Sequence, residues 1–314
     1  MTQVPAFHAE VLGSGDGFLT LGEGPVWDVA AGRLRWVDIQ AGIVFEGVLG
    51  EGGLSVTGRR AFGQTTGAVL PAEDGGFVVA GARHVLVLDP EWAQTRSIRL
   101  IADDVDSRLN DAVCDPAGRL LVGSLALDGR EGAASVWSLD GDGRVFLLVD
   151  GLTLANGMGF SPDGGTLYLV DSIPGIVHGF DYDVATGRVG ARRVVWRGAG
   201  LIPDGMTVDN GGDLWVAFFG AGQVRRISPA GEVLGIVEVA APNTTCPAFA
   251  GQNGDRLVVA TAREQLTPAQ LEEFPASGSL FVADVGVTGP PATPWGGSTV
   301  GQTGVHDTTA TEET

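Results

Sequence analysis

Cysteine is scarce in this sequence: Cys114 and Cys246 are the only two in 314 residues, and no CxxC pair occurs. A disulfide framework is therefore excluded, and a chain of this length can bury a core without one. Two isolated cysteines are typical of a reducing compartment, and the N-terminal residues lack the basic and apolar regions of an export signal. We therefore expect a cytoplasmic protein.

Positive charge is also scarce. The chain has 19 Lys and Arg against 38 Asp and Glu, which gives a net charge of −19. Nucleic-acid binding depends on basic patches, so this balance argues against nucleic-acid partners and against anionic membrane surfaces. No apolar run reaches the roughly 18 residues that a membrane span needs. With 44% hydrophobic residues, the composition is that of a soluble globular protein.

Several catalytic motifs are missing as well. The sequence has no Walker motif, GxSxG elbow, HExxH pair or EF-hand loop. Cys246 has no assigned base nearby, and a nucleophilic thiol needs one. Any chemistry must therefore come from a different arrangement of side chains.

What the sequence does contain is a repeat. Residues 206–217 (MTVDNGGDLWVA) have two short β-rich runs around an Asp/Asn/Gly turn, which predicts a hairpin. Six related hairpins occur, and the first apolar residues of their second strands are 43 to 47 residues apart. Units of this length have room for four short strands each. We predict an all-β fold, a six-bladed β-propeller with four-stranded blades around a central channel. A β-sandwich or β-helix with accidental regularity is the alternative.

The first residue of each unit occupies an equivalent position. In a propeller these six positions lie on the innermost strands and converge on the axis; they are Glu23, Thr66, Asn110, Asn156, Asp204 and Cys246. Carboxylate and amide oxygens around an axis favour a hard cation. The structural alternative is that each polar residue simply forms a turn beside the following glycine.

The ends of the chain have separate expectations. Residues 8–12 are predicted to be a strand that completes the last blade beside residues 279–284, and Thr267-Pro268 is typical of a helix start. We expect one propeller domain over residues 1–290. Residues 291–314, rich in Gly, Pro, Thr and Ser, are expected to form a partly disordered tail.

Four segments carry a resemblance to a known family. They are 21–27 (LGEGPVW), 108–111 (RLND), 156–163 (NGMGFSPD) and 203–209 (PDGMTVD), and they occur in the family's order. Together they resemble the gluconolactonase, regucalcin (senescence marker protein) and luciferin-regenerating enzyme family, over about residues 9–287.

The resemblance implies a propeller that holds one divalent metal with Glu23, Asn156 and Asp204. Calcium is the first expectation, and zinc, manganese, magnesium and iron(II) are compatible. Arg108 and Asn110 match the family's substrate contacts, and Asp128 falls near a further acidic contact in a loop that aligns poorly. The implied reaction is the hydrolysis of a sugar aldonolactone to the aldonic acid. The metal would polarise the carbonyl, and Asp204 would position or activate water.

Two departures from the family affect the choice of substrate. Ala112 stands where glycine is frequent, and residues 125–135, where relatives have a substrate lid, are shorter. Three alternatives stay open: hydrolysis of another ester or organophosphate, a non-catalytic calcium-binding regulator, and an interaction scaffold. The oligomeric state is left open.

Overall fold

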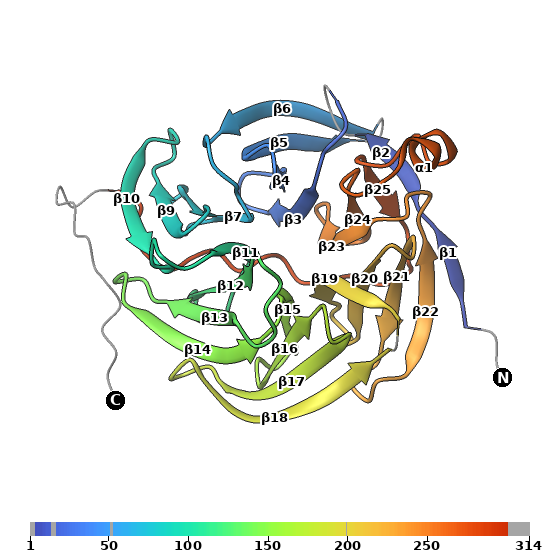
Figure 1. The fold of residues 1–314 in the computed structure, drawn as a ribbon. Helices are drawn as coiled ribbons and strands as arrows, with labels where there is room; N and C mark the ends of the chain where they lie inside the picture. Colours follow the sequence, from blue (N-terminus) through green and yellow to red (C-terminus); the bar gives the residue numbers. More distant parts are fainter. Residues whose placement is uncertain (1–3, 14–16, 51–52, 199, 301–314) are drawn as a thin grey trace.

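The chain folds into a ring of six β-sheets (Figure 1). This computed structural model describes residues 4–13, 17–50, 53–198 and 200–300. Each sheet forms a blade of four consecutive strand positions, with its first strand at the central channel. The prediction of an all-β six-bladed propeller with four-stranded blades is confirmed.

The first three blades follow one another along the chain. Blade 1 contains β3 (Gly22–Asp28), β4 (Arg33–Asp38), β5 (Ile43–Gly50) and β6 (Gly53–Ala61). Blade 2 contains β7 (Ala68–Pro71), β8 (Phe77–Ala80), β9 (His84–Leu88) and β10 (Gln94–Arg99). Blade 3 contains β11 (Ser107–Cys114), β12 (Leu120–Ala126), β13 (Ala134–Leu139) and β14 (Val145–Leu152).

The next three blades complete the ring. Blade 4 contains β15 (Ala155–Phe160), β16 (Thr166–Asp171), β17 (Ile176–Asp183) and β18 (Arg188–Arg197). Blade 5 contains β19 (Ile202–Val208), β20 (Leu214–Phe219), β21 (Gln223–Ile227) and β22 (Val233–Glu238). Blade 6 contains β23 (Thr244–Ala250), β24 (Arg256–Thr261) and β25 (Leu280–Ala283), with its fourth strand supplied from the N-terminus.

The N-terminal segment closes the ring. Strand β2 (Glu10–Gly13) pairs antiparallel with β25, which confirms the predicted completion of the last blade. Strand β1 (Ala6–His8) pairs parallel with β22 and adds an unpredicted fifth strand to blade 5. The first described residues therefore join the last two blades.

The core lies between the blades. Buried apolar side chains form six clusters, and each cluster combines residues from two neighbouring blades. Trp36 lies between blades 6 and 1, and Trp215 lies between blades 5 and 6; both are fully buried. Since a single blade has two apolar faces, only the closed ring removes both from water.

Turn chemistry sets the hairpins. In the turn after β19, Asp209 Oδ1 accepts hydrogen bonds from the backbone N–H groups of Gly211 (2.9 Å) and Asp213 (3.0 Å), and Gly212 has a φ of 92°. This is the local arrangement that the Asp/Asn/Gly cluster predicts.

Helix α1 (Pro268–Glu273) begins where the sequence predicts. The hydroxyl of Thr267 caps it by accepting a hydrogen bond from the Gln270 N–H (3.3 Å), and Pro268 occupies its first turn. Among the described residues, no helix is long and apolar enough to cross a membrane.

The segment after β25 packs across one end of the channel. Trp295 is fully buried among side chains of blades 2 and 3, and its backbone N–H donates to Pro71 O (2.8 Å). Asp74 accepts hydrogen bonds from the N–H (2.6 Å) and hydroxyl (2.7 Å) of Thr299. The predicted tail therefore begins with residues that contact the propeller, and its residues 301–314 lie outside the described part of the chain.

Candidate functional site

The innermost strands are irregular near the repeated polar position. In five blades the pairing of the first strand with the second shifts register there: between Glu23 and Val26, Leu109 and Ala112, Ala155 and Met158, Pro203 and Met206, and Thr244 and Pro247. Such β-bulges release residues from the ladder and re-aim their side chains. The bulges therefore contain or adjoin every one of the repeated polar positions except Thr66.

Two glycines let these strands approach closely. A Cβ atom on Gly157 would lie 2.6 Å from Asp204 O, and one on Gly205 would lie 2.5 Å from the Cβ and Sγ atoms of Cys246. Real Cβ contacts are essentially never this short, so a larger residue would push the blades apart. The glycine after Asn156 and the glycine after Asp204 therefore belong to the construction of the site.

Asn156 and Asp204 are in direct contact. They lie on β15 and β19 of neighbouring blades, and Asn156 Nδ2 donates to Asp204 Oδ1 and also to Ser172 Oγ (3.1 Å). Both side chains are buried, and the other amide atom, Asn156 Oδ1, is a buried oxygen without a hydrogen-bond partner. A buried acceptor left without a donor is costly unless a ligand or ion satisfies it.

Glu23 brings a second buried carboxylate to the same region. Its Oε2 accepts the Gly24 N–H (3.0 Å). Burial raises the pKa of Glu23 well above its usual range, and the negative charges of Asp204 and Asp111 raise it further. Arg108 opposes this shift only weakly. The site therefore holds more negative charge than the Arg108 guanidinium compensates.

The pKa values of Asp204 and Asp111 are also raised. Burial, and then the charge of Asp111, raise the pKa of Asp204 to about 8 against the effects of the Asn156 hydrogen bond and of Arg108. Burial raises the pKa of Asp111 to about 6, against the hydrogen bond from the Ala112 N–H. A cation bound among these carboxylates would favour their ionised forms.

Arg108 and Asn110 are arranged as a pair on β11. Arg108 Nη1 donates to Asn110 Oδ1 (2.8 Å) and to Leu109 O (2.9 Å), while Asn110 Nδ2 donates to Ala155 O (3.3 Å) on the next blade. Burial lowers the pKa of Arg108, and the charges of Glu264, Glu23 and Asp204 oppose that shift. Arg108 therefore lies within electrostatic reach of the two carboxylates.

Asp128 is exposed at the surface. It is in the exposed turn that follows β12, and its Oδ2 forms an ion pair with Arg130 Nε (2.6 Å). Of the six residues that the sequence predicts for the site, the structure connects five through contacts or charge effects and leaves Asp128 on the surface.

The residues fit a hard cation. The described part of the chain has no group of three His, Cys, Asp or Glu residues that could hold a metal. The candidate set instead combines two carboxylates, Glu23 and Asp204, with the unpartnered amide oxygen of Asn156. Oxygen donors of this kind are the ligands that calcium and magnesium prefer.

Comparison with known proteins shows the family of the chain. A family model described as the SMP-30/gluconolactonase/LRE-like region matches residues 21–263. The chain belongs to this family.

Family members resemble the chain along most of its length. Regucalcin of Sus scrofa is 33% identical over 88% of this chain and 95% of its own length. YvrE of Bacillus subtilis (strain 168), provisionally named a sugar lactone lactonase, is 30% identical over the same shares. The crystal structure of a calcium-binding regucalcin from Agrobacterium tumefaciens superposes with a TM-score of 0.86 at 29% identity, covering 94% of this chain and 99% of that one.

Two further residues contribute to the site without having been predicted for it. Ser172 orients the Asn156 amide, and Asp111 adds a third acidic charge. Asp111 lies inside one of the segments that carry the family resemblance and Ser172 lies outside them, and only the fold brings both to the other site residues. The sequence signal of Asp111 is its position directly after Asn110. That of Ser172 is its position directly after the last residue of β16.

Proposed function

We propose that the protein is a metal-dependent lactonase that opens a sugar aldonolactone to the aldonic acid. The observation that carries the proposal is the buried group of Glu23, Asn156 and Asp204, with the amide oxygen of Asn156 left without a partner. Membership of a family that includes sugar lactone lactonases supports the assignment.

The proposal gives each residue a role that its burial and contacts support. Glu23, Asn156 and Asp204 would hold one divalent cation, calcium first and zinc, manganese, magnesium or iron(II) as compatible alternatives. That cation would polarise the lactone carbonyl as a Lewis acid. Asp204 would position water and accept its proton, a contribution of about 10²–10⁴-fold.

Arg108 and Asn110 would bind the sugar. Their mutual hydrogen bond fixes the guanidinium, which keeps further N–H donors for sugar hydroxyls or the ring oxygen. The Arg108 guanidinium is therefore a hydrogen-bond donor close to the acidic side chains of Glu23 and Asp204. Such a pair suits a neutral, hydroxyl-rich substrate whose reacting carbonyl gains negative charge.

The decisive test is hydrolysis of glucono-, xylono- and galactonolactone by purified protein before and after chelation, with elemental analysis of the bound metal. We expect chelation to abolish turnover and added metal to restore it. Asp204→Asn should lower kcat by at least about a hundredfold, because it removes both a ligand and the base. Asp150→Asn, an exposed acid on β14, is the matched control and should leave kcat unchanged.

Tight calcium binding without turnover of any lactone would overturn the proposal in favour of a calcium-binding regulator. Protein without metal and without turnover would favour an interaction scaffold. In both cases Asp204→Asn would have no catalytic effect to measure.

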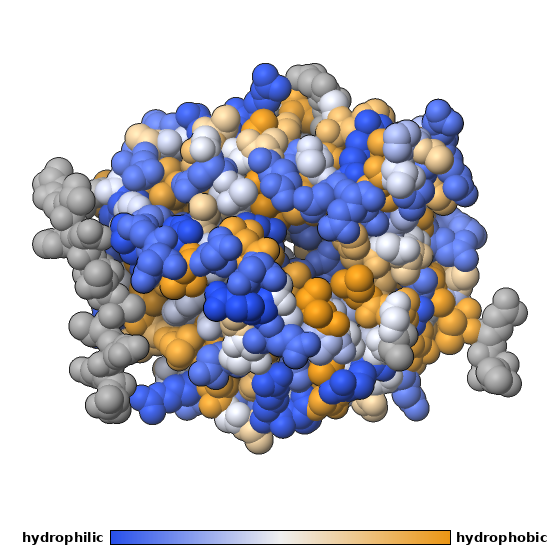
Figure 2. Space-filling view, viewed as in Figure 1, coloured by the Kyte–Doolittle hydropathy of each residue, from blue (hydrophilic) through white to orange (hydrophobic). Residues whose placement is uncertain are grey.

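A second candidate, hydrolysis of a more apolar ester, is favoured by the surroundings of the site. Exposed apolar side chains lie at the strand ends and turns next to it: Val105 before β11, Leu127 after β12, Ile173 beside Ser172, and Ile202 two residues before Asp204. Figure 2 shows hydrophobic residues beside the central opening over β19. A higher kcat/KM for phenyl acetate than for gluconolactone, lowered by Ile202→Ser, would favour this candidate.

A further inference from the structure

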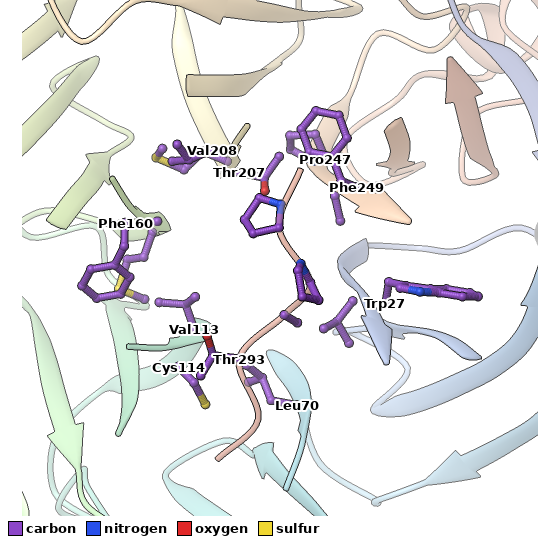
Figure 3. Close-up of a pocket in the computed structure, with 18 of the residues that line it drawn as sticks. Trp27, Leu70, Val113, Cys114, Phe160, Thr207, Val208, Pro247, Phe249 and Thr293 are labelled. Atoms are coloured by element: carbon purple, nitrogen blue, oxygen red, sulfur yellow. The ribbon is translucent and has the colours of Figure 1, made fainter. Parts of the chain in front are cut away.

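A cavity of about 370 Å³ lies in the central channel next to the candidate metal site. Its walls come from the residues that follow the site positions on the innermost strands of all six blades. Figure 3 shows side chains such as Val113, Phe160, Thr207 and Pro247 arranged around a chain segment that crosses the middle of the view. Small-molecule sites in proteins have volumes of about 300–1,000 Å³, so the cavity is large enough to be one.

The crossing segment is residues 290–293, and it is anchored on both sides. Before it, Thr288 O accepts the Asn210 N–H (2.9 Å) and Gly289 N–H donates to Gly254 O (2.9 Å). After it, Trp295 is buried against blades 2 and 3. The segment therefore forms a fixed floor, and Pro290 and Pro291 add apolar surface to it.

The walls are mainly apolar. Val26, Leu70, Met158, Met206 and Phe249 line the cavity, and each of them is buried. Thr207 and Thr293 contribute hydroxyl groups near the floor. An apolar surface of this extent binds apolar molecules by removing their surface from water.

Asp111 is the exception in the part of the cavity next to the candidate metal site. One carboxylate oxygen accepts the Ala112 N–H (2.7 Å), and the described residues offer the carboxylate no other hydrogen bond and no ion pair. Its negative charge adds to those of Glu23 and Asp204. A ligand in the cavity would therefore be favoured if it placed a positive, hydrogen-bond-donating group at Asp111.

We propose that this cavity is a second binding site, for a small apolar amine whose ammonium group contacts Asp111 and whose apolar body lies between the inner strands and residues 290–293. The site adjoins the proposed lactonase centre, with Asp111 common to both, and does not depend on that function. On β11 its walls come from Asp111 to Cys114, which follow the substrate-binding pair Arg108 and Asn110 along the strand.

The experiment uses calcium-saturated full-length protein and two aromatic probes of similar size, 2-phenylethylamine and 3-phenylpropionate. Calorimetry should show one amine bound per chain and no binding of the carboxylate. Excess gluconolactone should not displace the amine, which separates this site from the lactonase centre whether or not the lactone is hydrolysed.

Two variants and one control locate the bound probe. Thr207→Phe should fill the cavity and abolish amine binding, whereas Thr57→Phe, the same change on the exposed outer strand β6, should leave it intact. Asp111→Asn should weaken amine binding about tenfold or more, because it removes a charge-assisted hydrogen bond. Absence of amine binding, equal binding of both probes, or unchanged binding in both cavity variants would overturn the proposal.

Discussion

At the scale of single residues, the site is defined by buried carboxylates whose negative charge the Arg108 guanidinium does not fully compensate. Glu23 and Asp204 both have raised pKa values, burial being the largest cause for each. In the metal-free protein Asp204, with its pKa raised to about 8, therefore holds a proton near neutral pH. Metal binding must displace that proton, so affinity and pH are coupled.

This coupling predicts how the stability of the metal-free protein depends on pH. Folded Asp204 keeps its proton up to about pH 8, whereas an unfolded Asp loses it near pH 3.9. Between these values the folded state binds more protons, so the free energy of unfolding should fall as pH rises from 5 to 8. Calorimetric Tm values in chelator would show this fall, and Asp204→Asn should reduce its slope. Identical slopes for the two proteins would contradict the prediction.

A second prediction concerns the orientation of Asn156. Its Nδ2 donates to Ser172 Oγ (3.1 Å), so Ser172→Ala should leave the amide less well fixed and lower metal affinity about 10–100-fold. Competition with a metal-sensitive dye measures the change. Ser55→Ala, on the exposed strand β6, is the control and should bind metal like the parent protein.

At the scale of elements, the site depends on how closely neighbouring inner strands approach. Bulges release the polar residues from the regular ladder, and the glycines after Asn156 and Asp204 allow β15, β19 and β23 to pack together. These glycines are therefore structural residues of the site, although they present no functional group to a ligand.

Gly205→Ala tests this dependence. The added Cβ would lie 2.5 Å from Cys246 Cβ and Sγ, so β19 and β23 must separate, and we expect a destabilisation of about 1–3 kcal/mol together with weaker metal binding. Gly165→Ala is matched: its Cβ would lie no closer than 3.4 Å to Asp163. Chemical denaturation and metal titration of both variants decide the outcome, and equal behaviour would contradict the argument.

At the scale of the whole molecule, ring closure is the event on which the site depends. Its residues are contributed by blades that are far apart in the sequence, and β2 supplies the last strand of blade 6. Leu12 is 9% exposed and packs in the cluster between blades 6 and 1, next to Trp27 and Trp36. Loosening this junction should weaken the ring as a unit.

Leu12→Ala should therefore destabilise the protein by about 2–5 kcal/mol, since it removes buried apolar volume at the closure. Its neighbour Val11 is 55% exposed, and Val11→Ala should change stability by less than about 0.5 kcal/mol. Denaturant unfolding compares the two. A Leu12→Ala variant as stable as Val11→Ala would show that β2 is dispensable for closure.

Much of the fold was predictable because its signals are local. Alternation of apolar residues and Asp/Asn/Gly turns are written into each repeat, and equal spacing implies equal units. The helix start at Thr267-Pro268 is local for the same reason. The parallel pairing of β1 with β22 was not predictable, because it depends on an edge that exists only after blade 5 has formed.

The sequence by itself determined six repeated hairpin units and a carboxylate or amide side chain at the start of four of them, since side-chain periodicity and turn preference act between near neighbours. Only the tertiary structure decided that Asn156 contacts Asp204, that Ser172 and Asp111 join them, that Asp128 lies on the surface, and that residues 290–293 cross the channel. Those contacts depend on bulges and on packing between blades. They join residues that are far apart in the sequence, so local sequence patterns do not predict them.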